Sequence, residues 1–168
     1  MTDLFGSDGK VPWAAQKEEI QTVVLREGVT DIGQKAFSGC KNLTAVSLAQ
    51  GVTDIGDNAF SYCEKLTAAT LPDSVTSIGS YAFYQCNRLN AVTVPDGVTD
   101  IGDHAFACCA KLTAITVPRS VKKIGTGAFD WCPYSMQILY TGTKAEWAKF
   151  ADCFAGTVKC ADGIYGAD

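Results

Sequence analysis

A unit of 23 residues repeats through most of this chain, and it limits the fold more than any other feature of the sequence. Five consecutive blocks align without a gap from Val23 to Cys132. Six positions hold the same residue in all five blocks: a valine, an isoleucine, a glycine, an alanine, a phenylalanine and a cysteine. Such self-similarity, with a period of roughly 20 to 50 residues, is typical of chains that stack one supersecondary unit many times.

Two of the invariant positions are expected to form ladders through the core, because residues one repeat apart occupy the same place in neighbouring coils. The phenylalanine ladder consists of Phe37, Phe60, Phe83, Phe106 and Phe129. The cysteine ladder consists of Cys40, Cys63, Cys86, Cys109 and Cys132. Both ladders are predicted to be structural.

Each block divides into three parts with different hydrophobic patterns. The first is a short strand, as in residues 89–94, where apolar side chains point inward and Thr93 points out. The second is an extended segment that ends at a glycine such as Gly33, where we expect a backbone conformation that is costly for residues with a Cβ atom. The third is expected to be a helical turn, as in residues 57–63, with Ala59, Phe60 and Cys63 on its buried face.

One coil of this size cannot bury enough apolar surface to offset the entropy of ordering its own chain, so the coils must stack. The sequence therefore predicts an α/β repeat: a right-handed solenoid of short parallel strands and helical turns, capped at both ends. We assign residues 1–22 to an N-terminal cap and lead-in, residues 23–140 to five repeats, and residues 141–168 to a C-terminal cap helix and tail.

The C-terminal cap helix is predicted over about residues 144–152. Thr143 and Glu146 have the spacing of a capping box, in which both side chains satisfy free backbone N–H groups. Trp147, Phe150 and Ala151 would share one face of this helix and cover the last coil. A cap is needed because a terminal coil otherwise exposes apolar surface.

The composition suits a single repeat array and argues against several classes of function. The 168 residues carry 14 basic and 18 acidic side chains, a net charge of −4 without a cluster of Lys or Arg, so we expect no nucleic-acid partner. No apolar run approaches the roughly 20 residues of a membrane span, so we expect no membrane insertion. The N-terminal residues lack a signal-peptide pattern.

The run Ile-Gly-x-x-Ala-Phe-x-x-Cys-x-x-Leu-x-x-Val-x-x-Pro resembles the 23-residue leucine-rich repeats of BspA-type bacterial surface proteins. The match covers about residues 20–140, and the flanking segments Pro12-Trp13 and 140–147 are also similar to those of the family. The resemblance implies a leucine-rich-repeat-like fold in a secreted or surface-attached protein used for adhesion or protein binding. The resemblance implies no catalytic residues. It is also consistent with Met1 being an internal residue of a longer parent chain.

The eight cysteines have three interpretations: metal ligands, disulfides or buried free thiols. Zinc sites usually show cysteine pairs two to four residues apart, and no such pairs occur in this sequence. Ladder cysteines could meet the distance for a disulfide, but their side chains should point inward and not at each other. We therefore expect the ladder thiols to be free apolar fillers. Cys108 should be the most exposed, and a Cys153–Cys160 disulfide is left open.

Two further patterns could carry chemistry, and each also has a structural explanation. His104, the single histidine, and Cys108 are spaced i and i+4 and could form a Cys–His dyad, although both occupy outward positions that vary between repeats. The acidic residues Asp31, Asp54 and Asp100 could hold calcium or form a solvated face. We assign no catalytic, cofactor-binding or metal-binding residue, and we expect no cofactor.

The expected helical turns concentrate the chemical variety of the repeat, whereas the outward strand positions are small and uniform. Binding energy at protein interfaces depends largely on Trp, Tyr and Arg. The variable turn positions hold aromatic side chains in several repeats, although neutral drift at unconstrained positions would also produce variety. The predicted partner-binding residues are Tyr62, Tyr81, Tyr84, His104 and Trp131.

The sequence thus favours a non-catalytic, monomeric module that binds a protein ligand on a host or microbial surface, in adhesion. A first alternative is a structural spacer that presents other domains of a larger parent chain. A second is a Cys–His enzyme that uses Cys108 and His104. The identity of the ligand, the anchoring and the parent length do not follow from the sequence.

Overall fold

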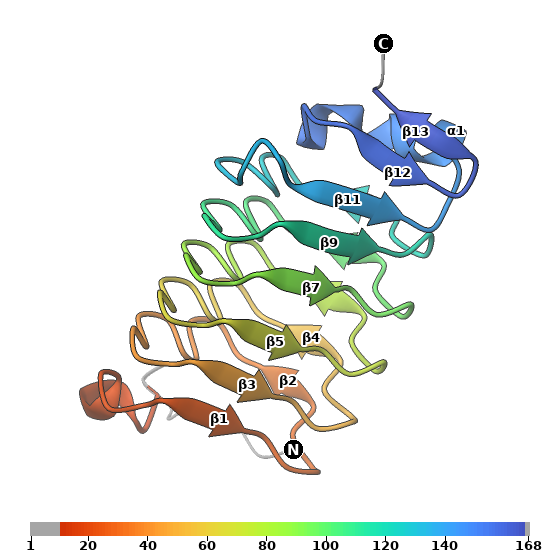
Figure 1. The fold of residues 1–168 in the computed structure, drawn as a ribbon. Coiled ribbons are helices and arrows are strands. Elements are labelled where there is room, and N and C mark those ends of the chain that lie inside the picture. Colours follow the sequence, from red (N-terminus) through yellow and green to blue (C-terminus); the bar gives the residue numbers. More distant parts are fainter. Residues whose placement is uncertain (1–10, 167–168) are drawn as a thin grey trace.

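Each repeat forms one coil of a parallel-strand solenoid, because its first strand lies beside the equivalent strand of the next coil (Figure 1). The computed structural model describes residues 11–166. The strands of this first face are β1 (Thr22–Val24), β3 (Ala45–Ser47), β5 (Ala68–Thr70), β7 (Ala91–Thr93), β9 (Ala114–Val117) and β11 (Gln137–Tyr140).

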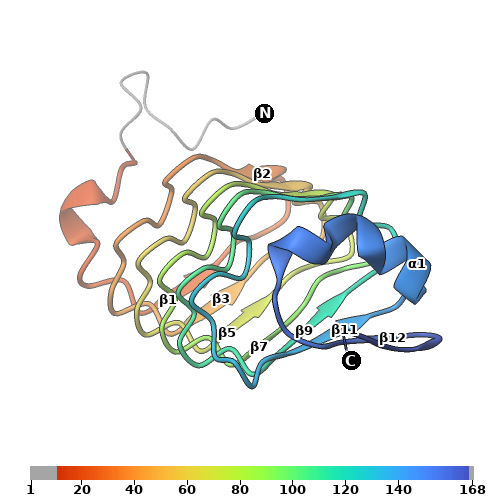
Figure 2. The same cartoon turned by 90° about the horizontal axis from the view of Figure 1, so that it is seen from above.

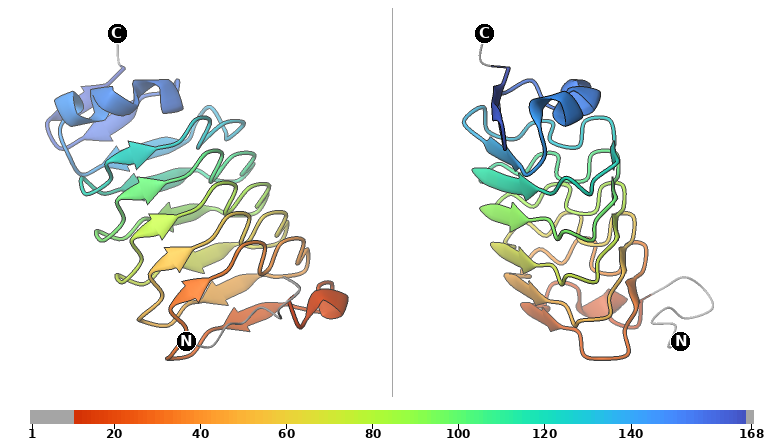
Figure 3. Two further views of the ribbon diagram at one scale, coloured as in Figure 1. Left: turned by 180° about the vertical axis from the view of Figure 1, so that it is seen from behind. Right: turned by 90° about the vertical axis from the view of Figure 1, so that its right-hand side faces the viewer.

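A second parallel sheet runs up the stack, visible from behind in Figure 3. Its isoleucines are aligned from coil to coil and point into the core, whereas the residues before them point outward. Its strands are β2 (Asp31–Ile32), β4 (Asp54–Ile55), β6 (Ser77–Ile78), β8 (Asp100–Ile101) and β10 (Lys123–Ile124). Seen along the stack, the two sheets and a zigzag of turns enclose the core (Figure 2).

The third part of each coil is a series of tight turns and not the expected helical turn. The N–H of Ala59 donates to Gly56 O, and the N–H of Cys63 donates to Phe60 O, so each bond closes a four-residue turn. Tyr62 has a φ of 59°, a left-handed conformation that is foreign to an α-helix. Two left-handed residues recur at these places in every repeat: Lys35 and Gly39, Asn58 and Tyr62, Tyr81 and Gln85, His104 and Cys108, and Gly127 and Trp131.

Hydrogen bonds between coils hold this unusual backbone in place. The N–H groups of Phe60 and Tyr62 donate to the carbonyl oxygens of Ala82 and Tyr84 in the next coil, at 2.8 and 2.7 Å. A left-handed conformation costs a residue with a Cβ atom roughly 1–2 kcal/mol. The turn segment offsets that cost because its amides pair alternately within the coil and with the next coil, which leaves few unsatisfied groups.

The phenylalanine and cysteine ladders run through the core. Successive phenylalanine rings stack with centroid separations of 5.4, 5.3, 5.3 and 6.1 Å. The cysteines beside them are free, and four of the five are buried, with Cys132 partly exposed. Each thiol from Cys63 onward donates to a phenylalanine carbonyl of the preceding coil at 3.2–3.3 Å, as Cys63 does to Phe37.

At the N-terminal end, two side chains form the hydrogen bonds that backbone N–H groups of a preceding coil form elsewhere in the stack. The ring of Trp13 stacks on Phe37 at 5.1 Å and so extends the phenylalanine ladder, although the repeat spacing assigns Trp13 to the alanine column. Its indole N–H donates to Ala36 O at 2.8 Å, and the Lys17 ammonium donates to Ser38 O at 2.9 Å. In later coils these carbonyls accept backbone N–H groups. The 3-10 helix η1 (Ala14–Gln16) lies between the two residues, and the part of the predicted lead-in before residue 11 is outside the described residues.

At the C-terminal end, a short α-helix continues as a 3-10 helix, so the predicted single helix is present in shorter form. The helices are α1 (Lys144–Trp147) and η2 (Ala148–Cys153), and the predicted capping box of Thr143 and Glu146 is confirmed. Trp147 is fully buried and packs on Tyr140 at a centroid distance of 5.2 Å. Phe150 is also buried, whereas the side chain of Ala151 is outside the described part. None of the helices within residues 11–166 has the length and apolar character to cross a bilayer.

Two more strands extend the first face beyond the last coil. β12 (Val158–Cys160) pairs in parallel with β11, and β13 (Gly163–Tyr165) pairs antiparallel with β12. Cys153 and Cys160 are both buried and both free. The disulfide that the sequence left open is therefore not formed in this structure.

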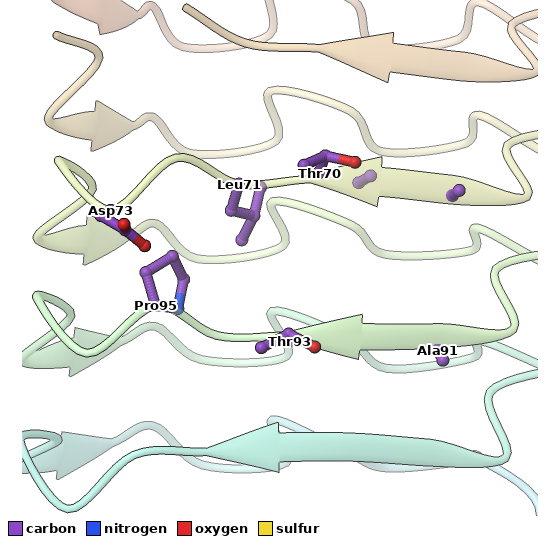
Figure 4. Close-up of a pocket in the computed structure, with 8 residues that line it drawn as sticks. Thr70, Leu71, Asp73, Ala91, Thr93 and Pro95 are labelled. Atoms are coloured by element: carbon purple, nitrogen blue, oxygen red, sulfur yellow. The ribbon is translucent and has the colours of Figure 1, made fainter. Parts of the chain in front are cut away.

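The first face is interrupted in the middle, between β5 and β7. β5 is the last strand of a three-stranded sheet, and β7 begins a separate five-stranded sheet. A groove of about 280 Å³ lies over this junction (Figure 4). The inward residue of β5 is Ala69, whereas β3 and β7 carry Val46 and Val92 at that place. A smaller side chain therefore coincides with the loss of strand pairing.

Candidate recognition surface

The left-handed turn positions hold the variable residues of the repeat on one edge of the molecule. Their side chains turn away from the core because the neighbouring alanine, phenylalanine and cysteine occupy the inward positions. Tyr62 and Tyr81 remain 45% and 37% exposed at these positions. This edge, here called the turn side, therefore presents different side chains in each coil on a repetitive backbone.

Four of the five predicted partner-binding residues come together on the turn side. Tyr84 contacts Tyr62 edge-on at a centroid distance of 5.4 Å and Tyr81 at 5.5 Å. Tyr81 in turn stacks on His104 at 5.0 Å. These four residues, here called the aromatic cluster, span three consecutive coils. Mutual packing restricts their rotamers, which lowers the entropy that a partner would have to remove on binding.

His104 fits into this cluster because the next coil carries glycine at the equivalent position. A Cβ atom on Gly127 would lie 2.5 Å from Cε1 of His104 and 2.6 Å from Asp130 Oδ2. Gly127 also has a φ of +62°, which glycine adopts without strain. The imidazole is thus bounded by the Tyr81 ring on one side and by the backbone of Gly127 on the other.

Trp131 does not join the aromatic cluster. It is 84% exposed, and its ring stacks on none of the cluster rings in the described residues. It instead borders a groove of about 260 Å³ between the fifth repeat and η2, lined by Phe129, Phe154 and Tyr134 among others. Tyr134 is fully exposed, and the sequence analysis missed it because it follows the last complete repeat, where the column pattern no longer applies.

The proposed Cys–His dyad loses its geometric basis. His104 and Cys108 would share a face in a helix, but both are left-handed residues of a turn segment. The imidazole stacks on Tyr81, and the Cys108 side chain lies against Tyr84. Cys108 and Cys132 are both partly exposed, so the expectation that Cys108 is the most exposed cysteine stays a prediction.

Burial makes the ladder thiols poor nucleophiles. Desolvation raises the pKa of the Cys132 thiol to about 11. It likewise raises the pKa of Cys86 and of Cys109 well above the ordinary value. Because the thiolate is the reactive form, these residues stay protonated and unreactive near neutral pH.

The acidic row forms hydrogen bonds of its own and is interrupted. The Asp54 carboxylate accepts from the hydroxyls of Thr53 and Ser77, both at 2.6 Å. Ser77 occupies the place between Asp54 and Asp100 in the sheet register. No group of three or more His, Cys, Asp or Glu side chains suited to a metal occurs within residues 11–166.

The family comparison agrees with the repeat found in the sequence. Residues 14–135 match the model of the BspA type leucine rich repeat region in six copies. No curated protein matches the chain.

Several solved structures are similar to the chain. A leucine-rich repeat protein of T. pallidum is 36% identical, with a TM-score of 0.69 over 72% of this chain and 59% of its own. A leucine-rich cell surface protein of Faecalibacterium prausnitzii is 31% identical, with a TM-score of 0.74 over 81% of this chain and 36% of its own. A leucine-rich repeat protein of Bacteroides ovatus is 32% identical, with a TM-score of 0.66 over 74% of this chain and 34% of its own. The chain thus spans between a third and three fifths of the length of these proteins.

Proposed function

Because the chain belongs to the BspA-type leucine-rich repeat family, we propose that it is a non-catalytic module that binds another protein through the turn side. The similar protein of F. prausnitzii is described as a cell surface protein, which supports a place at a bacterial surface or among secreted proteins. Adhesion to a host or microbial protein is the role that fits both the family and this location.

The aromatic cluster is the observation that carries this proposal. Tyr is among the residues that supply most binding energy at interfaces, and a rigid aromatic surface loses little entropy on binding. The outward positions of the first face are less suitable, because they hold small residues such as Ala68, Thr70 and Thr93. Trp131 and Tyr134 would supply a second contact at the C-terminal end of the same edge.

The test compares binding by three forms of the chain to immobilised host matrix proteins and to surface proteins of other bacteria. The first is unmodified, the second carries Tyr62→Ala, Tyr81→Ala and Tyr84→Ala, and the third is a matched control altered on the first face. The control replaces Thr70, Thr93 and Thr116 by alanine. A circular dichroism spectrum and an unfolding midpoint verify that each form folds.

We expect the tyrosine variant to bind at least tenfold more weakly, since each interface tyrosine typically contributes about 1 kcal/mol or more. The control should bind within about twofold of the unmodified chain. Equal binding by all three forms would refute the assignment of the aromatic cluster. Binding by none of them to any surface protein would favour the structural spacer.

A further inference from the structure

The groove beside Trp131 lies where the phenylalanine ladder ends. Successive rings of the ladder are within 14° of parallel, whereas Phe154, just after η2, meets the last ring, Phe129, edge-on at 84°. The stack of rings therefore does not continue into the C-terminal cap. The space that remains is a groove of about 260 Å³ bounded by residues 129–134 and 153–156, here called the C-terminal groove.

The walls of the C-terminal groove are aromatic, and two of them are open to solvent. Phe129 is buried, whereas the side chains of Trp131 and Tyr134 are exposed. The face of an aromatic ring carries partial negative charge and attracts cations, most strongly in the case of Trp. Exposed rings beside a groove therefore favour a cationic group over a neutral one.

Two carboxylates add negative charge to the same place. Asp130 lines the groove, and Asp152 immediately precedes Cys153, which also lines it. Burial first, and then the negative charges of Asp152 and Asp130, raise the pKa of the Cys153 thiol to about 12. Neither carboxylate forms an ion pair within residues 11–166. Both charges therefore remain available to a cation in the groove.

The basic residues at this end of the stack do not line the C-terminal groove. Lys111 occupies, in the fourth coil, the position that Tyr134 occupies in the fifth, so it lies on the side of Tyr134 away from η2. Lys149 belongs to η2 but is not part of the groove wall. Among the described residues that line the groove, the only formal charge is thus the negative charge of Asp130.

The backbone N–H of Trp131 indicates that the ligand is a polypeptide. The equivalent N–H groups of Tyr62, Gln85 and Cys108 each donate to a carbonyl oxygen of the next coil at 2.7–3.0 Å. For Trp131 no such acceptor occurs within residues 11–166, Ala151 aside. A main-chain carbonyl of a partner would complete the pattern. The volume of about 260 Å³ is also below the roughly 300–1,000 Å³ of small-molecule pockets, which suits a single side chain.

We propose that the C-terminal groove binds an arginine side chain of a partner protein. The guanidinium stacks on the ring of Trp131, and the carboxylates of Asp130 and Asp152 attract its charge. Arginine is preferred to lysine because the guanidinium is planar and more weakly hydrated than an ammonium group. The inference rests on the proposed function in taking the partner to be a protein, and it assigns the chemistry of the contact at the C-terminal end of the turn side.

Two blocked peptides test the proposal, each with one residue between two pairs of glycines. The central residue is arginine in the first and citrulline in the second, which keeps the shape of arginine but carries no charge. Binding is followed by NMR through the indole and backbone N–H signals of Trp131. We expect the arginine peptide to bind with a Kd of about 1–10 mM and the citrulline peptide to bind at least about fivefold more weakly. Equal binding of both peptides, or no saturable shift with the arginine peptide, would overturn the proposal.

A pair of charge variants locates the binding site. Asp130→Asn combined with Asp152→Asn removes both charges with little change in shape, and it should weaken binding of the arginine peptide at least about threefold without affecting the citrulline peptide. The matched control combines Asp73→Asn with Asp96→Asn, at exposed positions after β5 and β7, and should bind both peptides as the unmodified chain does. An equal loss of affinity in both variants would mean that overall charge attracts the peptide, and the proposal would fail.

Replacement of the exposed ring tests the aromatic wall. Trp131→Ala should lose saturable binding of the arginine peptide, followed through the backbone amide of Asp130, and a circular dichroism spectrum verifies that the variant folds. Unchanged affinity would refute the role of the ring.

The tyrosine variant separates this inference from the proposed function, because the aromatic cluster lies in other coils. It should bind the arginine peptide as tightly as the unmodified chain does. If the arginine peptide does not bind while foreign surface proteins still do, the inference about the groove fails alone. If the peptide binds as expected but no form of the chain binds a foreign surface protein, the proposed function fails and the arginine specificity of the groove holds.

Discussion

Replacement of Ala69 by valine tests whether one small side chain causes the interruption of the first face. Ala69 points inward from β5, where neighbouring coils carry Val46 and Val92. It is only 8% exposed, and it lines the groove of about 280 Å³ over the junction. Valine also has a higher β-propensity than alanine. We therefore expect Ala69→Val to stabilise the fold.

The magnitude follows from the buried surface. Two additional buried methyl groups contribute about 0.8 kcal/mol each, an upper limit of about 1.6 kcal/mol. Local crowding reduces this, so we expect the free energy of unfolding to increase by about 1 kcal/mol. Since a repeat array is held together by interfaces between neighbours, the gain should appear at the junction of β5 and β7.

Urea denaturation of the variant and two matched controls provides the assay. Ala45→Val adds the same methyl groups at an exposed position of β3 and should change stability by less than about 0.5 kcal/mol. Val92→Ala removes them from β7 and should cost about 1.6 kcal/mol or more, because a cavity remains. Hydrogen exchange should show slower exchange of backbone amides in β5 and β7 in Ala69→Val alone.

If Ala69→Val were no more stable than Ala45→Val, the small side chain would not be the cause of the interruption. The same would follow if stability rose without any slowing of amide exchange in β5 and β7. The gain would then come from β-propensity or from the unfolded chain.

Four further predictions concern the ends of the stack and the thiols. Trp13→Phe keeps an aromatic ring on the ladder but leaves Ala36 O without its indole donor. We expect it to lower the free energy of unfolding, measured by urea denaturation, by about 1–3 kcal/mol. Trp147→Ala should lower the free energy of unfolding by about 3–5 kcal/mol. Trp147→Phe should lower it less, because the buried indole N–H has no hydrogen-bond partner to lose within residues 11–166. In the native protein, Ellman's reagent at pH 8 should modify Cys108 first, and rapid modification of all eight cysteines would contradict the buried ladder. Stability should fall as the pH rises from 9 to about 11, because burial raises the pKa of the Cys132 thiol to about 11 from 9.0, so the unfolded chain releases a proton that the folded chain keeps. A stability curve that is flat over this range would show that the thiol is not held protonated.

The sequence by itself determined the features that follow from repetition and from local chemistry. Spacing of 23 residues aligned Phe60 with Phe83 and Cys63 with Cys86, because stacking places equivalent residues over one another. The capping box at Thr143 was also predictable, since it involves only residues within one helical turn.

Only the tertiary structure decided the features that depend on contacts between coils. Tyr62 is left-handed because its N–H reaches Tyr84 O in the next coil, and no local propensity of a tyrosine predicts that conformation. Trp13 leaves its column because its indole N–H donates to Ala36 O, whereas the equivalent carbonyls of later coils accept a backbone N–H of the preceding coil. The reason is the same in both places: a backbone group bonds to the partner that the neighbouring coil presents, and the sequence specifies that partner only once the stack has formed.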